Sequence, residues 1–101
     1  MPIVPAKVVT IIVGFEAQDI IEEKLKSVGV GGWSFAEIKG RGQRGNRLGG
    51  FVEGPNIAVT VITSEAIATD LLNWVTDELN PINPSVAYAV DAITGRRPKP
   101  A

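Results

Sequence analysis

The segment that most constrains the fold is residues 6–13, which read A-K-V-V-T-I-I-V and are almost continuously apolar and β-branched. Such a run predicts a central β-strand that is covered on at least one face. Residues 56–63 (N-I-A-V-T-V-I-T) and 86–92 (V-A-Y-A-V-D-A) predict two more strands, and residues 32–38 (G-W-S-F-A-E-I) predict a fourth. At 101 residues the chain is long enough for one domain with its own core.

Two segments between these strands have the periodicity of amphipathic helices. Over residues 16–28, apolar side chains recur at spacings of three and four, acidic residues crowd the first half and lysines the second. This charge order complements the helix dipole, and Gly29 ends the helix. A second helix is predicted over residues 65–79, with Ser64 as its N-cap.

The element order β-α-β-β-α-β predicts an α+β fold of the ferredoxin-like type, with two helices on one face of a four-stranded antiparallel sheet. Several strands look apolar on both faces, so we expect a second copy of the chain to cover the open face, in a homo-oligomer. The chain is predicted to be a single domain over residues 1–101, with a flexible loop at residues 40–55 and a mobile tail at residues 94–101.

Composition excludes several classes of site and partner. The net charge is −1 and the pI is near 5.3, which argues against a general nucleic-acid binder. The sequence has no Cys and no His, so disulfides and the usual zinc and transition-metal sites are excluded. The longest apolar run is too short to cross a bilayer and no signal peptide is recognisable, so we expect a cytoplasmic protein without membrane insertion.

The glycine/arginine loop, residues 39–50, reads K-G-R-G-Q-R-G-N-R-L-G-G and holds four cations and five glycines. Glycines let backbone N–H groups approach a ligand closely, and arginines form bidentate hydrogen bonds to phosphate or carboxylate oxygens. The loop therefore predicts an anion site. Two alternatives remain open at this point: a solvated hairpin tip without a ligand, and an RNA-binding segment, although no aromatic residue is interleaved for base stacking.

Catalysis has no visible candidate in the sequence. Without His or Cys, and with no Ser in a nucleophile motif, covalent catalysis lacks its usual groups, and no Walker-type phosphate loop is present. Glu37 is more readily explained as a solvent-facing strand residue than as a general base. Trp74 is more readily explained as a core or interface residue than as a ligand platform. The basic tail motif at Arg96 and Arg97 is by itself a weak signal.

Several motifs resemble the PII signalling family. The chain has V-T-I-I at residues 9–12, G-V-G-G at residues 29–32 and S-F-A-E-I-K-G-R-G at residues 34–42. In the PII family, a strand with this K-G-x-G entry leads into a long ligand-sensing loop. The loop here is shorter, lacks the family's modified tyrosine, and resembles the G-x-G-x-R-x-x-R loop of PII-like proteins associated with carboxysomes or bicarbonate transporters.

Further departures concern phosphate binding. The glycine-rich loop that precedes the last strand in PII proteins is replaced here by residues 80–84, which read N-P-I-N-P. The arginines that precede the family's terminal T-G fall on Asp91 and Ile93. The redox-active cysteine tail of some PII-like proteins is also missing, which excludes that mode of regulation.

The resemblance implies a non-catalytic, trimeric sensor that binds AMP, ADP, ATP or cyclic AMP between subunits, in some members with bicarbonate as effector. It implies no further cofactor, and signalling through the ordered loop to a protein target of inorganic-carbon metabolism, such as a bicarbonate transporter or a carboxysome component. Carboxysome association would then refine the cytoplasmic location. The resemblance implies these nucleotide-binding residues: Ser34, near the adenine; Lys39, Gly40, Arg41, Gly42, Arg44 and Arg47, around phosphate or bicarbonate; and Arg96 and Arg97, reaching the same cleft from the tail.

Two other functions compete with this interpretation. One is a small ferredoxin-like phosphohydrolase that uses a loop arginine to hold phosphate, and the other is a structural adaptor trimer without a small ligand.

Overall fold

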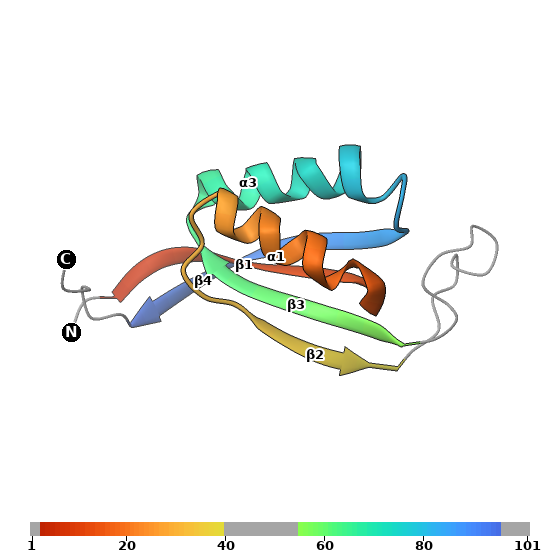
Figure 1. Ribbon diagram of the computed structural model, residues 1–101. Coiled ribbons are helices and arrows are strands. Elements are labelled where there is room, and N and C mark those ends of the chain that lie inside the picture. Colours follow the sequence, from red (N-terminus) through yellow and green to blue (C-terminus); the bar gives the residue numbers. More distant parts are fainter. Residues whose placement is uncertain (1–2, 40–54, 96–101) are drawn as a thin grey trace.

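The computed structural model describes residues 3–39 and 55–95 of the chain. In the described residues, four strands form one antiparallel sheet in the order β2-β3-β1-β4. Figure 1 shows both long helices on the same side of this sheet. The predicted α+β, ferredoxin-like fold is confirmed. The elements in chain order are β1 (Ile3–Gly14), η1 (Phe15–Ala17), α1 (Gln18–Ser27), β2 (Ser34–Ile38), β3 (Asn56–Thr63), α3 (Glu65–Trp74), η2 (Val75–Leu79) and β4 (Ser85–Gly95).

The strand boundaries match the sequence-based prediction in part. β3 has the predicted bounds, whereas β1 and β4 are both longer than predicted because their ends pair with each other, from Ile3 opposite Gly95 onward. Thr94 and Gly95, the first two residues of the predicted mobile tail, are therefore the last two residues of β4. The rest of that tail, and residues 40–54 of the predicted loop, lie outside the described residues.

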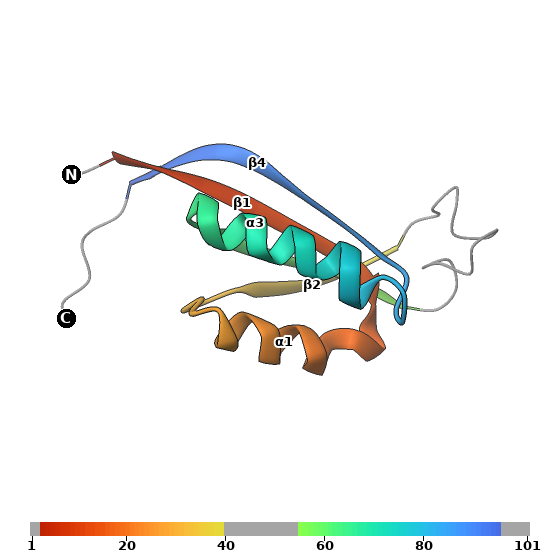
Figure 2. The same ribbon diagram turned by 90° about the horizontal axis from the view of Figure 1, so that it is seen from above.

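The core lies between the sheet and the two helices. Alternate side chains of β1 and β3 point toward the helices, and Ile11 in the central strand is completely buried. Figure 2 shows α1 and α3 side by side along the strands, with α3 nearer to β1 and β4. The main buried side chains are Val9, Ile11 and Val13 of β1, Ile57, Val59 and Val61 of β3, Ile21 and Leu25 of α1, and Leu71 of α3.

α1 ends at a glycine, as predicted. Gly29 has φ +90°, a left-handed conformation that favours glycine over residues with a Cβ atom. The Val30 N–H donates to the Leu25 carbonyl at 3.0 Å, and the Gly29 N–H donates to the Lys26 carbonyl at 3.1 Å. These two bonds are those of a Schellman cap, and they direct the chain out of the helix toward β2.

α3 begins with the predicted cap, because the Ser64 hydroxyl accepts a hydrogen bond from the Ile67 N–H at 3.3 Å. The predicted helix over residues 65–79 is present, but its last turn, η2, is a π-helix closed by a bond of 2.8 Å from the Asn80 N–H to the Val75 carbonyl. Leu79 follows the buried Val75 by four residues and is buried as well. Trp74 packs against the core, with its ring centre 5.7 Å from Lys24 Nζ.

The sheet face opposite the helices, here called the open face, carries no charged side chain among the described residues. It is formed by the even-numbered strand positions, because directly opposed residues of antiparallel strands share a face. The charged strand residues Lys7, Glu37 and Asp91 are all at odd-numbered positions. Val86, Tyr88 and Val90 of the open face are 43 to 50% exposed. Such a face is a candidate for contact with another protein surface.

The replacement of Ile11 by Ala tests the position of the core. We expect Ile11→Ala to lower the free energy of unfolding by about 2–5 kcal/mol, because it removes apolar contacts and leaves a cavity. Denaturant unfolding followed by circular dichroism measures this loss. The matched control is Ile20→Ala on the exposed side of α1, where the side chain is 46% exposed and the expected loss is much smaller. Equal losses in the two variants would contradict this assignment of the core.

Candidate functional site

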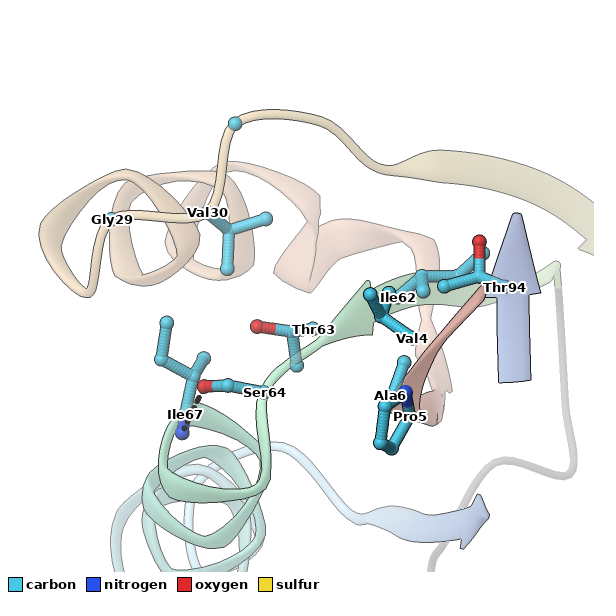
Figure 3. Close-up of a pocket in the computed structure, with 11 residues that line it drawn as sticks. Val4, Pro5, Ala6, Gly29, Val30, Ile62, Thr63, Ser64, Ile67 and Thr94 are labelled. Atoms are coloured by element: carbon cyan, nitrogen blue, oxygen red, sulfur yellow. Dashed lines mark hydrogen bonds between the residues drawn. The ribbon is translucent and has the colours of Figure 1, made fainter. Parts of the chain in front are cut away.

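A pocket of about 330 Å³ opens where the end of β3 meets the start of α3 and the chain leaving α1. Figure 3 shows Val30 and Ile67 facing it from opposite sides, with Thr63 and Ser64 between them. The residues that line it are Val4, Pro5, Ala6, Gly29, Val30, Gly31, Ile62, Thr63, Ser64, Ile67 and Thr94.

Two helix caps build the walls of this pocket. The Schellman cap of α1 places Val30 and Gly31 at its rim, and the N-cap of α3 places Ser64 and Ile67 opposite them. Since these backbone positions are fixed by hydrogen bonds inside the chain, the two walls are held in place before any ligand arrives. The extended ends of β1 and β4 complete the pocket on its third side.

The pocket is neutral as far as the structure describes its lining. None of the described lining residues carries a charge, their apolar side chains come from Val, Ile, Pro and Ala residues, and Thr63, Ser64 and Thr94 supply hydroxyl groups. An apolar hollow with a few hydrogen-bonding groups suits a flat heterocycle such as a nucleobase. Residues 3–39 and 55–95 place no cation among its lining residues to balance phosphate or another anion.

Gly31 has no steric reason to be glycine within its own chain. A Cβ atom added at Gly31 or Gly32 would meet nothing within 4 Å, and neither residue has a positive φ. The same open space makes the Gly31 backbone accessible at the rim of the pocket. Glycine at such a position permits close approach of a group from outside the chain.

Of the predicted site residues, only Ser34 and Lys39 lie in the described part of the chain, and neither of them lines this pocket. Ser34, at the start of β2, is opposite Thr60 and its side chain is on the open face. Lys39 is exposed and follows the other end of β2. The remaining predicted site residues lie outside the described residues: Gly40, Arg41, Gly42, Arg44, Arg47, Arg96 and Arg97.

The pocket and the start of the glycine/arginine loop are at opposite ends of the sheet. Ile38, next to Lys39, is paired with Asn56 at one end of β3, whereas Ile62 and Thr63 of the pocket are at the other end. Seven residue steps along β3 correspond to about 24 Å. Figure 1 shows the same arrangement, with β2 ending far from the start of α3.

The charges of the chain are segregated in the sequence. Six of the ten Lys and Arg residues, but only Glu53 of the eleven acidic residues, fall in residues 40–54 and 96–101. The described part therefore has four cations against ten carboxylates. An anionic ligand in the neutral pocket would need cations from outside the described part of the chain, from Lys39, or from another copy.

A second hollow, of about 430 Å³, lies beside the first and shares Pro5 and Ala6 with it. Here Lys7 forms an ion pair with Asp91, directly opposite it on β4. The hydrogen bond from Lys7, together with its positive charge, lowers the pKa of the Asp91 carboxyl. The hydrogen bond to Asp91 is the main reason why the pKa of Lys7 is raised.

Two other kinds of site are not found in residues 3–39 and 55–95. No group of three or more acidic side chains is placed to hold a metal ion there. None of the helices in the same residues combines the length and apolar character that a transmembrane helix requires.

Sequence reasoning missed the pocket residues as a group. Gly29 was identified as a helix stop and Ser64 as an N-cap, which are their local roles, but neither was assigned to a ligand site. The available signal was the pair of glycines at positions 31 and 32, which no helix cap explains. Thr63, Ile67 and Thr94 gave no local signal, because only the fold brings them together.

Comparisons of this chain with a family model and with solved structures both identify PII or PII-like proteins. The model of the family "Nitrogen regulatory protein P-II" matches residues 6–98. A crystal structure of a protein from Thermus thermophilus described as PII-like signalling protein has 28% identity, a TM-score of 0.77, and coverage of 93% of this chain and 92% of that chain. No match was found among curated proteins.

Structures of CPII from Thiomonas intermedia, a nitrogen regulatory PII-like protein, are also similar. The apo form has 18% identity and a TM-score of 0.80, with coverage of 95% of this chain and 98% of that chain. The form bound to ADP and bicarbonate has 21% identity and a TM-score of 0.78, with coverage of 94% and 93%. At this level of identity the likeness to CPII shows the fold alone.

The Lys7–Asp91 pair generates a prediction about pH. Because the folded-state pKa of Asp91 is lowered, the pair stabilises the fold above the pKa of the unfolded state and loses this effect as the pH falls through the folded value. The Asp91 side chain is 87% exposed, so the effect on stability is small and screened by salt. NMR titration should give a carboxyl pKa below the ordinary value of about 3.9, and Lys7→Met should restore that value. An identical Asp91 pKa in both proteins would contradict the ion pair.

Proposed function

Since this chain belongs to the nitrogen regulatory protein P-II family, we propose that it is a non-catalytic sensor that binds an adenine nucleotide between copies of itself. The observation that carries the proposal is the separation between a neutral pocket and the cationic loop. The pocket suits the base of a nucleotide, and the loop suits its phosphates. Within one chain, the pocket lies about 24 Å from the point where β2 ends and the loop begins.

The neutral pocket is the proposed site of the base. Val30 and Ile67 would contact the two faces of the ring, and the hydroxyl group of Thr63 would bond to its edge. Close passage of the ligand past Gly31 explains why a residue without Cβ is present in open space.

The phosphates, or bicarbonate beside them, would be held by the glycine/arginine loop of a neighbouring copy. Backbone N–H groups of Gly40 and Gly42 and the side chains of Lys39, Arg41, Arg44 and Arg47 suit oxyanions. Arg96 and Arg97 directly follow the β4 end that lines the pocket, so they are proposed as a second source of charge.

A cyclic trimer satisfies this arrangement. In a closed head-to-tail ring, the loop of each copy meets the pocket of the next copy, so that no loop and no pocket is left without a partner. The uncharged and largely apolar open face supports the same assembly, because such a sheet face is a candidate for contact with another protein surface. In this assembly Ser34 of the open face would lie at a contact between copies, from which its hydroxyl could reach the base.

The expected affinity is modest. A shielded charge-assisted hydrogen bond contributes about 1.5–3 kcal/mol, and micromolar binding corresponds to about −8 kcal/mol. Two or three arginine contacts together with burial of the base are enough to reach this range. Fixing loop residues on binding opposes the gain by about 1–2 kcal/mol for each residue.

Signalling would follow from ordering of the loop by the ligand, with a protein target recognising the ordered form. CPII, which shares this fold, has been solved with ADP, AMP and bicarbonate, and this supports adenine nucleotides and bicarbonate as the first ligands to test. A bicarbonate transporter or a carboxysome component is the proposed class of target, in the cytoplasm.

Calorimetry with AMP, ADP, ATP and cyclic AMP, with and without bicarbonate, tests the proposal. We expect at least one nucleotide to bind at micromolar concentration. Gly31→Val should weaken binding at least about tenfold, which corresponds to about 1.4 kcal/mol, because its side chain would occupy the rim of the pocket. Gly32→Val is the matched control, since its side chain also meets open space but does not line the pocket. Absence of binding below millimolar concentration for every nucleotide would contradict the sensor function.

The loop requires a separate variant. Arg44→Ala should weaken binding of ADP about tenfold to a hundredfold by loss of a charge-assisted contact, whereas Lys26→Ala on the exposed surface of α1 should leave the affinity unchanged. The same proteins should show no hydrolysis of ATP or ADP above background. Steady turnover that disappears in Arg44→Ala would instead identify a phosphohydrolase.

A further inference from the structure

Four hydroxyl side chains form a straight row across the open face, here called the hydroxyl row. Thr10 of β1 is directly opposite both Thr60 of β3 and Tyr88 of β4, and Thr60 is directly opposite Ser34 of β2. Each of the four strands therefore contributes one hydroxyl at the same level of the sheet.

Apolar rows lie on both sides of the hydroxyl row. On the side of the loop, Ile12 is opposite Ala58 and Val86. On the side of the pocket, Val8 is opposite Ile62 and Val90. The open face is thus striped: one polar row between two apolar rows, and no charged side chain among the described residues.

The hydroxyls of this row have no hydrogen-bond partner within the described part of the chain. In residues 3–39 and 55–95, no side-chain hydrogen bond, ion pair or ring contact involves the side chain of any member of the hydroxyl row. Thr–Thr pairs across strands can bond to each other, but here they do not. Each hydroxyl is therefore available as both donor and acceptor toward whatever covers the face.

Burial of the open face would be unfavourable if these hydroxyls stayed unpaired, because a buried polar group without a partner loses its bonds to water. Hydroxyls are complementary to one another, since each donates and accepts. A second copy of the chain presents the same row, and it also presents no charge that would need a counter-ion. A partner rich in charged side chains would find no such counter-ion here.

We propose that the hydroxyl row fixes the register between copies of this chain, by pairing Thr10, Thr60 and Tyr88 with hydroxyls of the neighbouring copy. This inference rests on the proposed assembly. It adds the feature that selects one alignment of the open faces over the others. A slip of two residues, about 6.7 Å, would place the hydroxyls against Ile12 and Val86 or against Val8 and Val90. Only the aligned arrangement satisfies both kinds of row, so the polar row specifies the assembly while the apolar rows stabilise it.

The experiment compares wild type with the double variant Thr10→Val, Thr60→Val by native mass spectrometry and light scattering of the full chain. Valine has nearly the same shape as threonine and is a good strand residue, so the subunit should still fold, and circular dichroism checks this. We expect wild type to form one oligomeric species. The valine variant should lose that single distribution and populate additional species at the same concentration, because its face no longer distinguishes between registers.

Two further variants serve as controls. Thr10→Ser, Thr60→Ser keeps the hydroxyls and should keep the single species, and Thr69→Val, on the exposed surface of α3, should also behave as wild type. A single species identical to wild type in the valine variant would overturn the role of the hydroxyl row while leaving the assembly intact. A monomeric wild type would overturn the assembly itself, and the role of the row with it.

Discussion

The structure depends on one constraint: two helices can cover only one face of a four-stranded sheet. The side chains of β1 alternate between Ile11, completely buried beneath the helices, and Ile12, on the open face. Both faces of this strand are apolar, so the fold of a single chain buries one of them and leaves the other. The proposed self-association would complete the burial, and the absence of charge on the open face among the described residues agrees with it.

The same two-layer arrangement separates the two halves of the candidate site. β2 and β3 lead to and from the glycine/arginine loop at one end of the sheet, while the caps of α1 and α3 meet at the other end. In the proposed assembly, the neutral pocket of one copy and the cationic loop of another would meet at a junction between two sheets. The proposed ligand would then report on assembly and loop conformation together, which is a suitable basis for a regulatory signal.

Local sequence signals were sufficient for the fold. The β-branched runs, Ser64 and Gly29 each act through their own backbone neighbourhood, and the elements that they predict are present. The ends of β1 and β4 were underestimated because they depend on pairing between Ile3 and Gly95, which are far apart in the sequence.

The candidate site was less predictable than the fold. The charges of the loop are visible in the sequence, but a pocket made by Val30, Thr63 and Thr94 depends on three separate elements meeting. The prediction that Arg44 and Arg47 hold an anion remains a prediction, since both lie outside the described residues. What the structure adds is the position of a pocket that we propose as the binding site of the base.

Mixing two inactive variants tests most directly whether one ligand is held by two copies. Gly31→Trp blocks the pocket and leaves the loop intact, while Arg44→Ala, Arg47→Ala disables the loop and leaves the pocket intact. A mixed trimer has one junction where an intact loop meets an intact pocket, so co-assembly of equal amounts should restore about a quarter of the wild-type ADP sites. If mixed trimers form but bind no more ADP than the separate variants, the ligand is not shared between copies and the account is wrong.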